Sequence, residues 1–360
     1  MNLAKVVFGG TGSKHDLKNE DKRMQQDLLR KSIQGNSLTS ILRRRLQYGD
    51  RPWNILLVTM AFLVVALMLA IGLLIWNGSA AARMKAGIAF ILPTHDASWN
   101  AITGQFQAWP FIYGTLVTSI TAIIVALPIS LGIAIFLAEL SPRWLRLPLG
   151  WMVELLAAIP SVIYGLWGIY LFLPKVIVPT GNLMGAALSK LPGLGLLFSG
   201  TIPESGASRL AASFILAIMI IPTIAAVSRD VFLAIPSTQR EASLALGSTQ
   251  WETIWQVLIP YGLSGILGAV ILGLGRAIGE TMAVTMVIGN SIQGSASLLR
   301  PGYTMSSIIA NEFAEAYNAL HTSALIYVAV ILFILSVLIN VIARLLVWRV
   351  ARRNPTEARA

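Results

Sequence analysis

The sequence predicts an all-α protein that crosses a membrane several times, and its composition carries the prediction. Of the 360 residues, 56% are hydrophobic and only 12% are charged, and the mean hydropathy is +0.72. Soluble domains carry about 25% charged residues, so a water-soluble fold of this size would lack the polar side chains to cover its surface. A soluble enzyme, a disordered chain and a coiled coil are therefore excluded.

Residues that bind metals or form disulfides are scarce. The chain has no cysteine, which excludes disulfide frameworks, iron–sulfur clusters, thiolate zinc sites and cysteine nucleophiles. Its three histidines, His15, His95 and His321, lie far apart in the sequence and do not indicate a metal site. We expect no metal and no cofactor bound by this chain.

Six apolar segments are long enough to cross a bilayer. The first, at residues 54–76, spans about 34 Å as a helix and is flanked by Trp53 and Trp76, as in the aromatic belt of a membrane protein. The other five lie at 112–138, 148–173, 210–228, 260–289 and 323–343. Pro160 and Pro222 fall inside the third and fourth. Since proline frees backbone carbonyls that other groups then have to satisfy, the helices are expected to pack in a bundle.

Lysine and arginine are distributed unevenly between the two sides of these spans. With the N-terminus inside, the inner segments hold 20 Lys and Arg and the outer segments hold 6. Cytoplasmic segments of membrane proteins carry such an excess, so the sequence predicts that both termini are cytoplasmic. Most of the net charge of +11 is then explained by the orientation of the protein in the membrane, where basic residues can also contact lipid head groups. It therefore gives no reason to expect that the protein binds nucleic acid.

The predicted domains are a cytoplasmic extension at 1–52, a transmembrane domain at 53–350 and a cytoplasmic tail at 351–360. A glycine-rich run at residues 9–14 is close to a phosphate loop, but a Walker A sequence has Ser or Thr after its lysine, and here Ser13 precedes it. We therefore expect no ATPase motif in this chain, so that any ATP hydrolysis belongs to a partner subunit.

The predicted inner segment at 229–259 differs from a short connecting loop. It carries Glu241, Ala242 and Ser243, then Gly247 four positions on, and ends in the run Val-Leu-Ile before Pro260. This resembles the EAA loop of ABC importer permeases, whose pattern is E-A-A, three residues, G, nine residues and I-x-L-P. The departures are Ser for Ala, Val for Ile and Ile for Leu, all similar in size.

The spacing within this segment also predicts a local structure. Residues 239–247 are expected to form a short helix that Gly247 turns back towards the membrane, and Pro260 is expected to open the fifth span. Such a rigid projection would transmit force from a soluble partner.

The fifth span makes the resemblance more specific. Residues 275–290 read GRAIGETMAVTMVIGN, which resembles the PstC-type permease family of phosphate ABC importers. Four other stretches resemble the same family: ELLAAIPS at 154–161, YGLWG at 164–168, RPGYT at 300–304 and ANEFAEA at 310–316. The resemblance runs from about 112 to 350, and residues 1–50 fall outside it.

The resemblance implies a fold, a substrate and partners. The fold would be the six-helix fold of type I ABC importer permeases in the bacterial inner membrane, and the substrate would be inorganic phosphate. The partners would be a PstA-type permease, two copies of a PstB-type ATPase that hold ATP–Mg, and a PstS-type binding protein outside. By the same resemblance, the residues that couple to the ATPase are Arg240, Glu241, Ala242, Gly247 and Pro260, with Glu241 as the anchor of the segment. Thr281 and Thr285 are implied to line the substrate pathway.

Arg276 and Glu280 are also singled out by their chemistry. Arg276 is the one Lys or Arg inside the predicted spans, where a cation costs at least about 2.5–3.5 kcal/mol. Glu280 lies four residues later, on the same face of a continuous helix, so an ion pair between them is predicted. That pair either closes a helix interface or holds Arg276 until phosphate competes for its guanidinium fork. On the same helix, Gly275 and Gly279 predict a close contact with another helix.

Two functions of other classes stay open on residue chemistry alone. An ion-coupled secondary anion transporter would use Arg276 and Glu280 as a proton relay, but inverted repeats and broken helix pairs, the usual signs of that class, are not evident. A membrane-embedded enzyme would require more clustered catalytic groups than the spans contain. Among ABC importers, a permease for another oxyanion is the nearest alternative to a phosphate permease.

Overall fold

The computed structural model describes residues 53–93, 99–193, 195–292 and 294–353. The chain divides into two compact units, Met1–Ile71 and Gly72–Ala360. The described part of the first unit is helical and belongs to the helix Trp53–Gly78, whose most apolar stretch has no buried residue. The predicted extension at 1–52, with its glycine-rich run, and residues 354–360 of the predicted tail lie outside the described residues.

The described residues are almost entirely helical, with two isolated β-bridges and no longer strand. Five helical segments are long and apolar enough to cross a membrane: Trp53–Gly78, Trp109–Leu140, Ser161–Leu188, Arg209–Ala234 and Ala319–Val350. A bent pair, Gln250–Tyr261 and Leu263–Gly279, raises the number to six if the pair is one span. The predicted all-α class is confirmed, and the six predicted spans compare with five or six candidate spans among the described residues.

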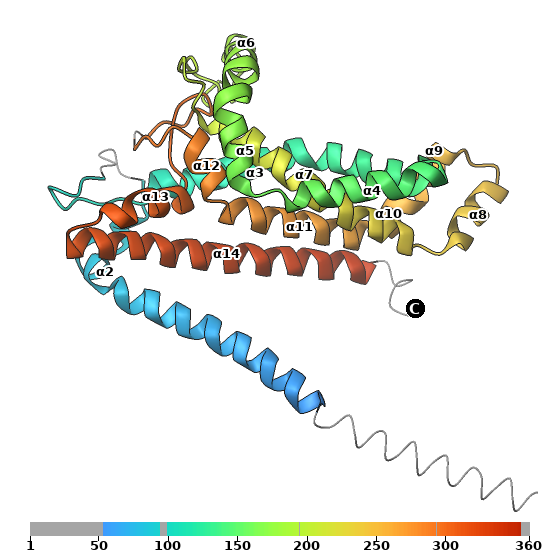
Figure 1. The fold of residues 1–360 in the computed structure, drawn as a ribbon, viewed down its shortest axis with the longest axis horizontal. Coiled ribbons are helices and arrows are strands. Elements are labelled where there is room, and N and C mark those ends of the chain that lie inside the picture. The colour runs from blue at the N-terminus through green and yellow to red at the C-terminus, as the bar shows by residue number, and fades with distance from the viewer. Residues whose placement is uncertain (1–52, 94–98, 194, 293, 354–360) are drawn as a thin grey trace, which may run out of the picture. The chain divides into compact units, whose positions relative to one another are not determined.

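Helix α7 (Arg209–Ala234) is the centre of the second unit. It packs along α3 (Trp109–Ile135) and also contacts α4 (Arg143–Ala158) and α11 (Leu263–Gly279), while α14 (Ala319–Arg353) lies against α11 (Figure 1). Two thirds of its most apolar stretch is buried, against about a quarter in α3 and α14. A helix that is apolar on all sides belongs in such a central position.

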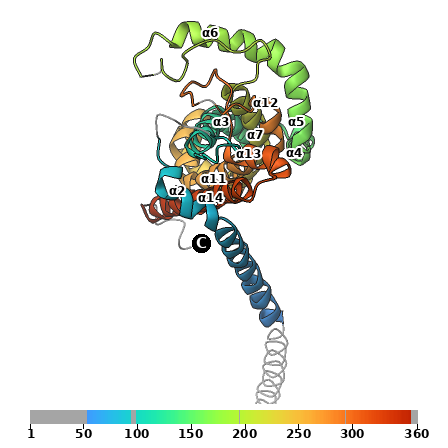
Figure 2. The same cartoon turned by 90° about the vertical axis from the view of Figure 1, so that its left-hand side faces the viewer.

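The predicted third span, 148–173, is not one helix. Helix α4 ends at Ala158, Ile159 adopts an extended conformation with ψ 130°, and α5 (Ser161–Trp167) follows. Pro160 explains the break, because proline has no N–H and disfavours helical geometry in the residue before it. The chain continues through the π-helical η3 (Gly168–Ile177) into α6 (Val178–Leu188), which leads away from the bundle (Figure 2).

The carbonyls released at this break find partners on other residues. The Tyr164 hydroxyl donates to the Leu156 carbonyl at 2.9 Å, and the Arg276 guanidinium donates to the Ala157 carbonyl at 3.3 and 3.4 Å. The expectation that neighbouring groups satisfy the carbonyls freed by Pro160 is confirmed. The break therefore provides an acceptor for Arg276.

The predicted fifth span, 260–289, is also interrupted. Its helix begins earlier, at Gln250, passes through the π-helical η4 (Ile254–Leu258) and α10 (Ile259–Tyr261), and bends by 71° before α11. Pro260 thus lies at a bend and does not open the span. At the other end α11 stops at Gly279, Glu280 is extended with ψ 128°, and α12 (Met282–Val287) is a separate helix.

The predicted close contact at Gly275 and Gly279 is wrong within this chain. A Cβ added to either residue would meet no atom within 4 Å, so both face open space. The packed glycine of α11 is Gly273, where a Cβ would lie 2.7 Å from the Ile224 side chain of α7. The sequence spacing found a glycine-lined face but assigned the tight packing to the wrong side of the helix.

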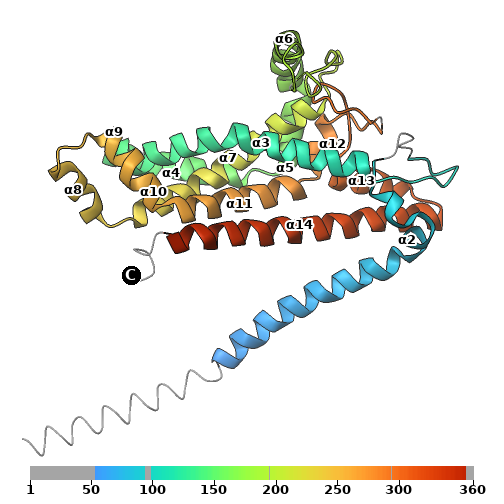
Figure 3. The same ribbon diagram turned by 180° about the vertical axis from the view of Figure 1, so that it is seen from behind.

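The two ends of the bundle differ in structure. Helix α8 (Ser237–Ala245) and α9 (Gln250–Thr253) lie at one end, which is also where α14 finishes (Figures 1 and 3). Helix α6, the short α2 (Ala80–Ala86) and α13 (Met305–Glu312) lie towards the other end. The predicted inner segment and the end of the last helix are therefore on one side, as a cytoplasmic C-terminus requires.

Candidate functional site

The predicted coupling segment forms a helix followed by a sharp turn. Helix α8 covers Ser237–Ala245, and the Leu246 N–H closes its last turn on the Ala242 and Ser243 carbonyls at 3.2 Å. Gly247 then has φ +89°, in the left-handed region that side chains disfavour, while a Cβ there would meet no atom within 4 Å. Glycine is required at 247 by backbone conformation and not by lack of space.

Local hydrogen bonds return the chain from α8 to the next helix. The Thr249 hydroxyl accepts from the Glu252 N–H at 3.2 Å and the Glu252 carboxylate accepts from the Thr249 N–H at 2.8 Å, which is a capping box. The Ser243 and Thr253 hydroxyls are hydrogen-bonded at 2.9 Å in a buried position. Ser243, a departure from the E-A-A pattern, therefore has a structural use that spacing alone did not reveal.

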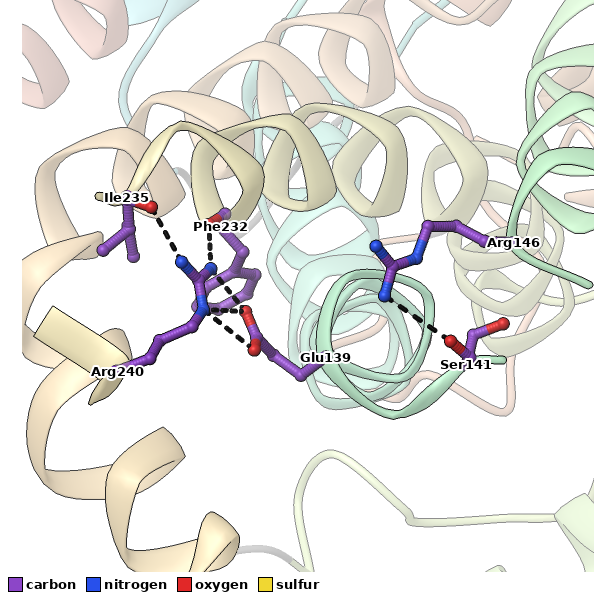
Figure 4. Close-up of polar contacts among 6 residues, drawn as sticks. All are labelled: Glu139, Ser141, Arg146, Phe232, Ile235 and Arg240. Carbon is purple, nitrogen blue, oxygen red and sulfur yellow. Dashed lines mark hydrogen bonds and ion pairs between the residues drawn. The ribbon is translucent and has the colours of Figure 1, made fainter. Parts of the chain in front are cut away.

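Arg240 attaches α8 to the bundle (Figure 4). Its Nε lies 3.0 Å from both Glu139 carboxylate oxygens, and its Nη2 lies 2.6 Å from one of them. The same guanidinium donates to the Ile235 carbonyl at 2.7 Å and to the Phe232 carbonyl at 2.6 Å. Glu139 belongs to η2 (Phe136–Leu140) at the end of α3, so one side chain joins α8, α3 and the end of α7.

Within this chain Arg240 holds the segment to the bundle. Glu241, the predicted anchor, is exposed and makes no hydrogen bond or ion pair with the described residues, so any anchoring by Glu241 would have to be to a partner and stays a prediction. Ala242 is exposed as well. The carboxylate that fixes the segment is Glu139, 101 residues earlier in the chain, which no local pattern could identify.

Arg276 lies inside the bundle where α11, α7 and the α4–α5 break meet. Its Nη1 donates to the Thr223 hydroxyl at 3.1 Å, and both Nη atoms reach the Ala157 carbonyl. These three contacts leave at least two of the five guanidinium N–H groups without an acceptor among the described residues. Arg276 also lines a cavity of about 870 Å³ between α7, α11 and α14.

The predicted ion pair between Arg276 and Glu280 does not form. Because α11 ends at Gly279, Glu280 is not on a helical face with Arg276, and its carboxylate accepts from the Ala283 N–H at 3.2 Å. Within the described part of the chain, Arg276 has no carboxylate partner. The i,i+4 argument fails here because it assumes an unbroken helix.

The two predicted pathway threonines make local contacts. The Thr281 hydroxyl donates to the Gly279 carbonyl at 3.2 Å and the Thr285 hydroxyl donates to the Thr281 carbonyl at 2.7 Å. Both side chains are half-buried beside the break between α11 and α12. Both threonines follow Arg276 and Glu280 along the chain. Since their hydroxyls are used as donors, their oxygens can still accept hydrogen bonds.

The sequence predicted that Arg276 is the single basic residue within the spans, but the candidate spans of the structure contain others. Lys175 lies in the candidate span Ser161–Leu188 and is exposed, whereas Arg209, at the start of α7, is 1% exposed. Arg209 donates to the Ser295 and Ser297 carbonyls at 2.9 and 3.0 Å. The predicted span began at residue 210, so Arg209 was counted among the charges of the outer loop. Ser208, the N-cap of α7, was the sequence signal that the helix already includes Arg209.

Comparison with known proteins agrees with this geometry. The structure is similar to a chain in the crystal structure of a bacterial alginate ABC transporter in complex with an alginate pentasaccharide-bound periplasmic protein, with a TM-score of 0.54, 15% sequence identity, and coverage of 86% of this chain and 98% of that chain. The fold is therefore that of the membrane-spanning component of an ABC importer.

The sequence comparisons define the family. Residues 130–352, more than half of the chain, match the family described as binding-protein-dependent transport system inner membrane component, and this chain belongs to that family. It is therefore a multi-pass inner-membrane subunit that works with a separate ATPase and a binding protein.

Two curated relatives share the same description. A phosphate transport system permease protein PstC of Xylella fastidiosa (strain Temecula1 / ATCC 700964) is 44% identical over 300 residues, which are 83% of this chain and 90% of the relative. One of Mesorhizobium japonicum (strain LMG 29417 / CECT 9101 / MAFF 303099) is 44% identical over 311 residues, 86% and 94% of the two chains. The predicted resemblance to PstC-type permeases is confirmed.

Proposed function

We propose that this chain is a permease subunit of an ATP-driven importer and that it carries inorganic phosphate across the cytoplasmic membrane. The similarity to phosphate transport permeases supports the substrate. The observation that carries the chemistry is Arg276, a cation inside the bundle with spare N–H donors and no carboxylate among the described residues. Phosphate is an anion whose oxygens fit a guanidinium fork.

The proposed complex has three kinds of partner. A PstA-type permease would complete the pathway, a PstB-type ATPase dimer would bind ATP–Mg below α8, and a PstS-type protein would deliver phosphate outside. Arg276 would take the anion in the bundle, and Thr281 and Thr285 would offer hydroxyls to its oxygens beside the break. Glu280 would hold that break open by capping α12 through the Ala283 N–H.

Coupling to ATP would run through α7. The ATPase is proposed to move α8. It would contact the exposed residues Glu241 and Ala242 and the turn at Gly247. Arg240 would pass this motion to α7 at the Phe232 carbonyl. Thr223, nine residues earlier on the same helix and so about 13 Å away along its axis, contacts Arg276 at 3.1 Å. One rigid helix thus connects the segment that meets the ATPase with the proposed anion contact.

The test is uptake of labelled phosphate by vesicles that contain the full complex, normalised to assembled complex. We expect uptake to require ATP and to prefer phosphate over sulfate. Arg276→Gln is expected to abolish uptake, and the matched variant Thr223→Val, which removes a partner of Arg276 but keeps its charge, is expected to reduce it only partly. Equal uptake of sulfate would reassign the substrate. Normal uptake by Arg276→Gln would remove Arg276 from the pathway.

A further inference from the structure

A second arginine lines the cavity that Arg276 faces. Arg344, on α14, borders the same space of about 870 Å³, together with Asn340 on the preceding turn and Trp348 on the following one. The two arginines come from helices that run in opposite directions and are 68 positions apart in the sequence. No sequence pattern connected them.

The charge in this cavity is uncompensated by its lining. The residues that line it include two arginines and no Asp or Glu, and neither arginine forms an ion pair with a described carboxylate. Arg276 is half-buried and Arg344 is exposed, and two like charges on the wall of one open space raise each other's energy. An anion between them removes that cost and gains charge-assisted hydrogen bonds from both.

The wall of the cavity leaves room for such an anion. Gly268 and Gly275, seven residues apart on one face of α11, both line it, and a Cβ on either would meet no atom within 4 Å. The cavity follows α14 from Asn340 to Trp348, towards the end where α8 also lies (Figure 1). An anion that leaves Arg276 for the inner face would therefore pass Arg344.

We propose that Arg344 is a second anion-binding residue, which receives inorganic phosphate from Arg276 in this cavity on the way to the cytoplasm. The proposal rests on the proposed function and extends it to a residue of the last helix. A phosphate group could also come from the head group of an anionic lipid, because arginine and tryptophan near the inner end of a span suit lipid contacts. The proposal commits to the free anion, and the experiment separates the two sources.

The experiment measures labelled phosphate uptake by the full complex in two kinds of vesicle, phosphatidylcholine alone and an equal mixture with phosphatidylglycerol. Arg344→Gln is expected to lower uptake about 10-fold to 100-fold in both, the effect of one charge-assisted hydrogen bond. Uptake by Arg344→Lys is expected to lie between that of the unaltered protein and that of Arg344→Gln, because an ammonium keeps the charge but cannot form the paired hydrogen bonds of a guanidinium. The matched control is Arg349→Gln, on the same helix but not lining the cavity, with uptake near that of the unaltered protein.

Two results would overturn the proposal. Equal uptake by Arg344→Gln and Arg349→Gln would make Arg344 an orientation anchor, and a loss confined to the mixed vesicles would make it a lipid contact. If Arg344→Gln does not assemble, Arg344→Lys against Arg349→Lys gives the same comparison with the anchoring charge kept. Loss of uptake in Arg276→Gln with normal uptake in Arg344→Gln would refute this inference alone, whereas normal uptake in both would also remove Arg276 from the pathway, and uptake of sulfate equal to that of phosphate would overturn the proposed substrate.

Discussion

Arg240 and Arg276 are both half-buried arginines that join helices, but their surroundings differ. Arg240 contacts both oxygens of Glu139 and two backbone carbonyls, and its ion pair is as short as 2.6 Å. Arg276 contacts one carbonyl and one hydroxyl at 3.1–3.4 Å and no described carboxylate. A satisfied guanidinium holds parts together, whereas an unsatisfied one has donors left for a ligand.

Under the proposed function, this difference separates a region that couples to the ATPase from a region that binds the anion. The inner end around Arg240 is fixed by charge pairing, capping and a glycine turn, which suits a segment that receives force. The region around Arg276 is formed by two helix breaks, at Pro160 and Glu280, which leave polar groups and space inside the bundle. Four predictions test whether the division holds.

The largest effect is expected from Arg276. Arg276→Gln should lower phosphate uptake by at least about 100-fold, because two or more charge-assisted hydrogen bonds to the anion are lost, while the assembled complex stays as abundant. Combining it with Glu280→Gln should not restore uptake, since the two side chains are not paired. Uptake and complex yield are measured together. Recovery in the double variant would show that the residues do pair in the working protein.

Arg240 should behave in the opposite way, with a loss of stability and of coupling. Arg240→Ala is expected to cost about 3 kcal/mol, at the low end for a buried ion pair because both side chains keep some exposure. The variant should release α8 and weaken association with the ATPase, measured by thermal unfolding in detergent and by co-purification. Glu139→Ala should do the same. If the two single losses are additive in the double variant, the pair is not the attachment.

Gly247 should show a smaller effect that depends on backbone conformation. Gly247→Leu is expected to insert normally but weaken ATPase association, because a side chain at φ +89° costs roughly 1–2 kcal/mol. Gly247→Asn should be milder, as asparagine tolerates this region better. Gly132→Ala is the control, since Gly132 also faces open space but lies within a helix. Equal association by all these variants would mean that the turn does not carry the coupling.

The smallest effect is expected at the capping box. Thr249→Ala should cost about 1 kcal/mol by removing the cap of α9. Thr281→Ala is the matched control for stability, because Thr281 occupies the N-cap of α12 without a side-chain cap bond. The midpoint of thermal unfolding should fall for the first and stay nearly constant for the second. The reverse order would show that the segment after α8 is held by other contacts.

The sequence by itself determined the class of the protein, four of its candidate spans, and the helix and turn of the predicted coupling segment. These follow from local quantities: the length of an apolar run, the sides on which Lys and Arg collect, and the fixed spacing from Glu241 to Gly247 and Pro260. A left-handed glycine can be recognised in the same way, because the need for it lies in one residue's own backbone. Arg276 was identified because a cation inside an apolar run is unusual whatever it contacts.

Only the tertiary structure decided the partners of these residues. The carboxylate for Arg240 comes from another helix, 101 residues away, and the acceptor for Arg276 is a carbonyl released by a proline 116 positions before it. The pairing of Arg276 with Glu280 was wrong because one extended residue at the end of α11 removes the helical register on which it depended. Periodicity can propose which side chains share a face of a helix. Where a helix breaks and what packs beside it depend on the whole chain, because the free energy of the break is balanced by contacts with distant segments.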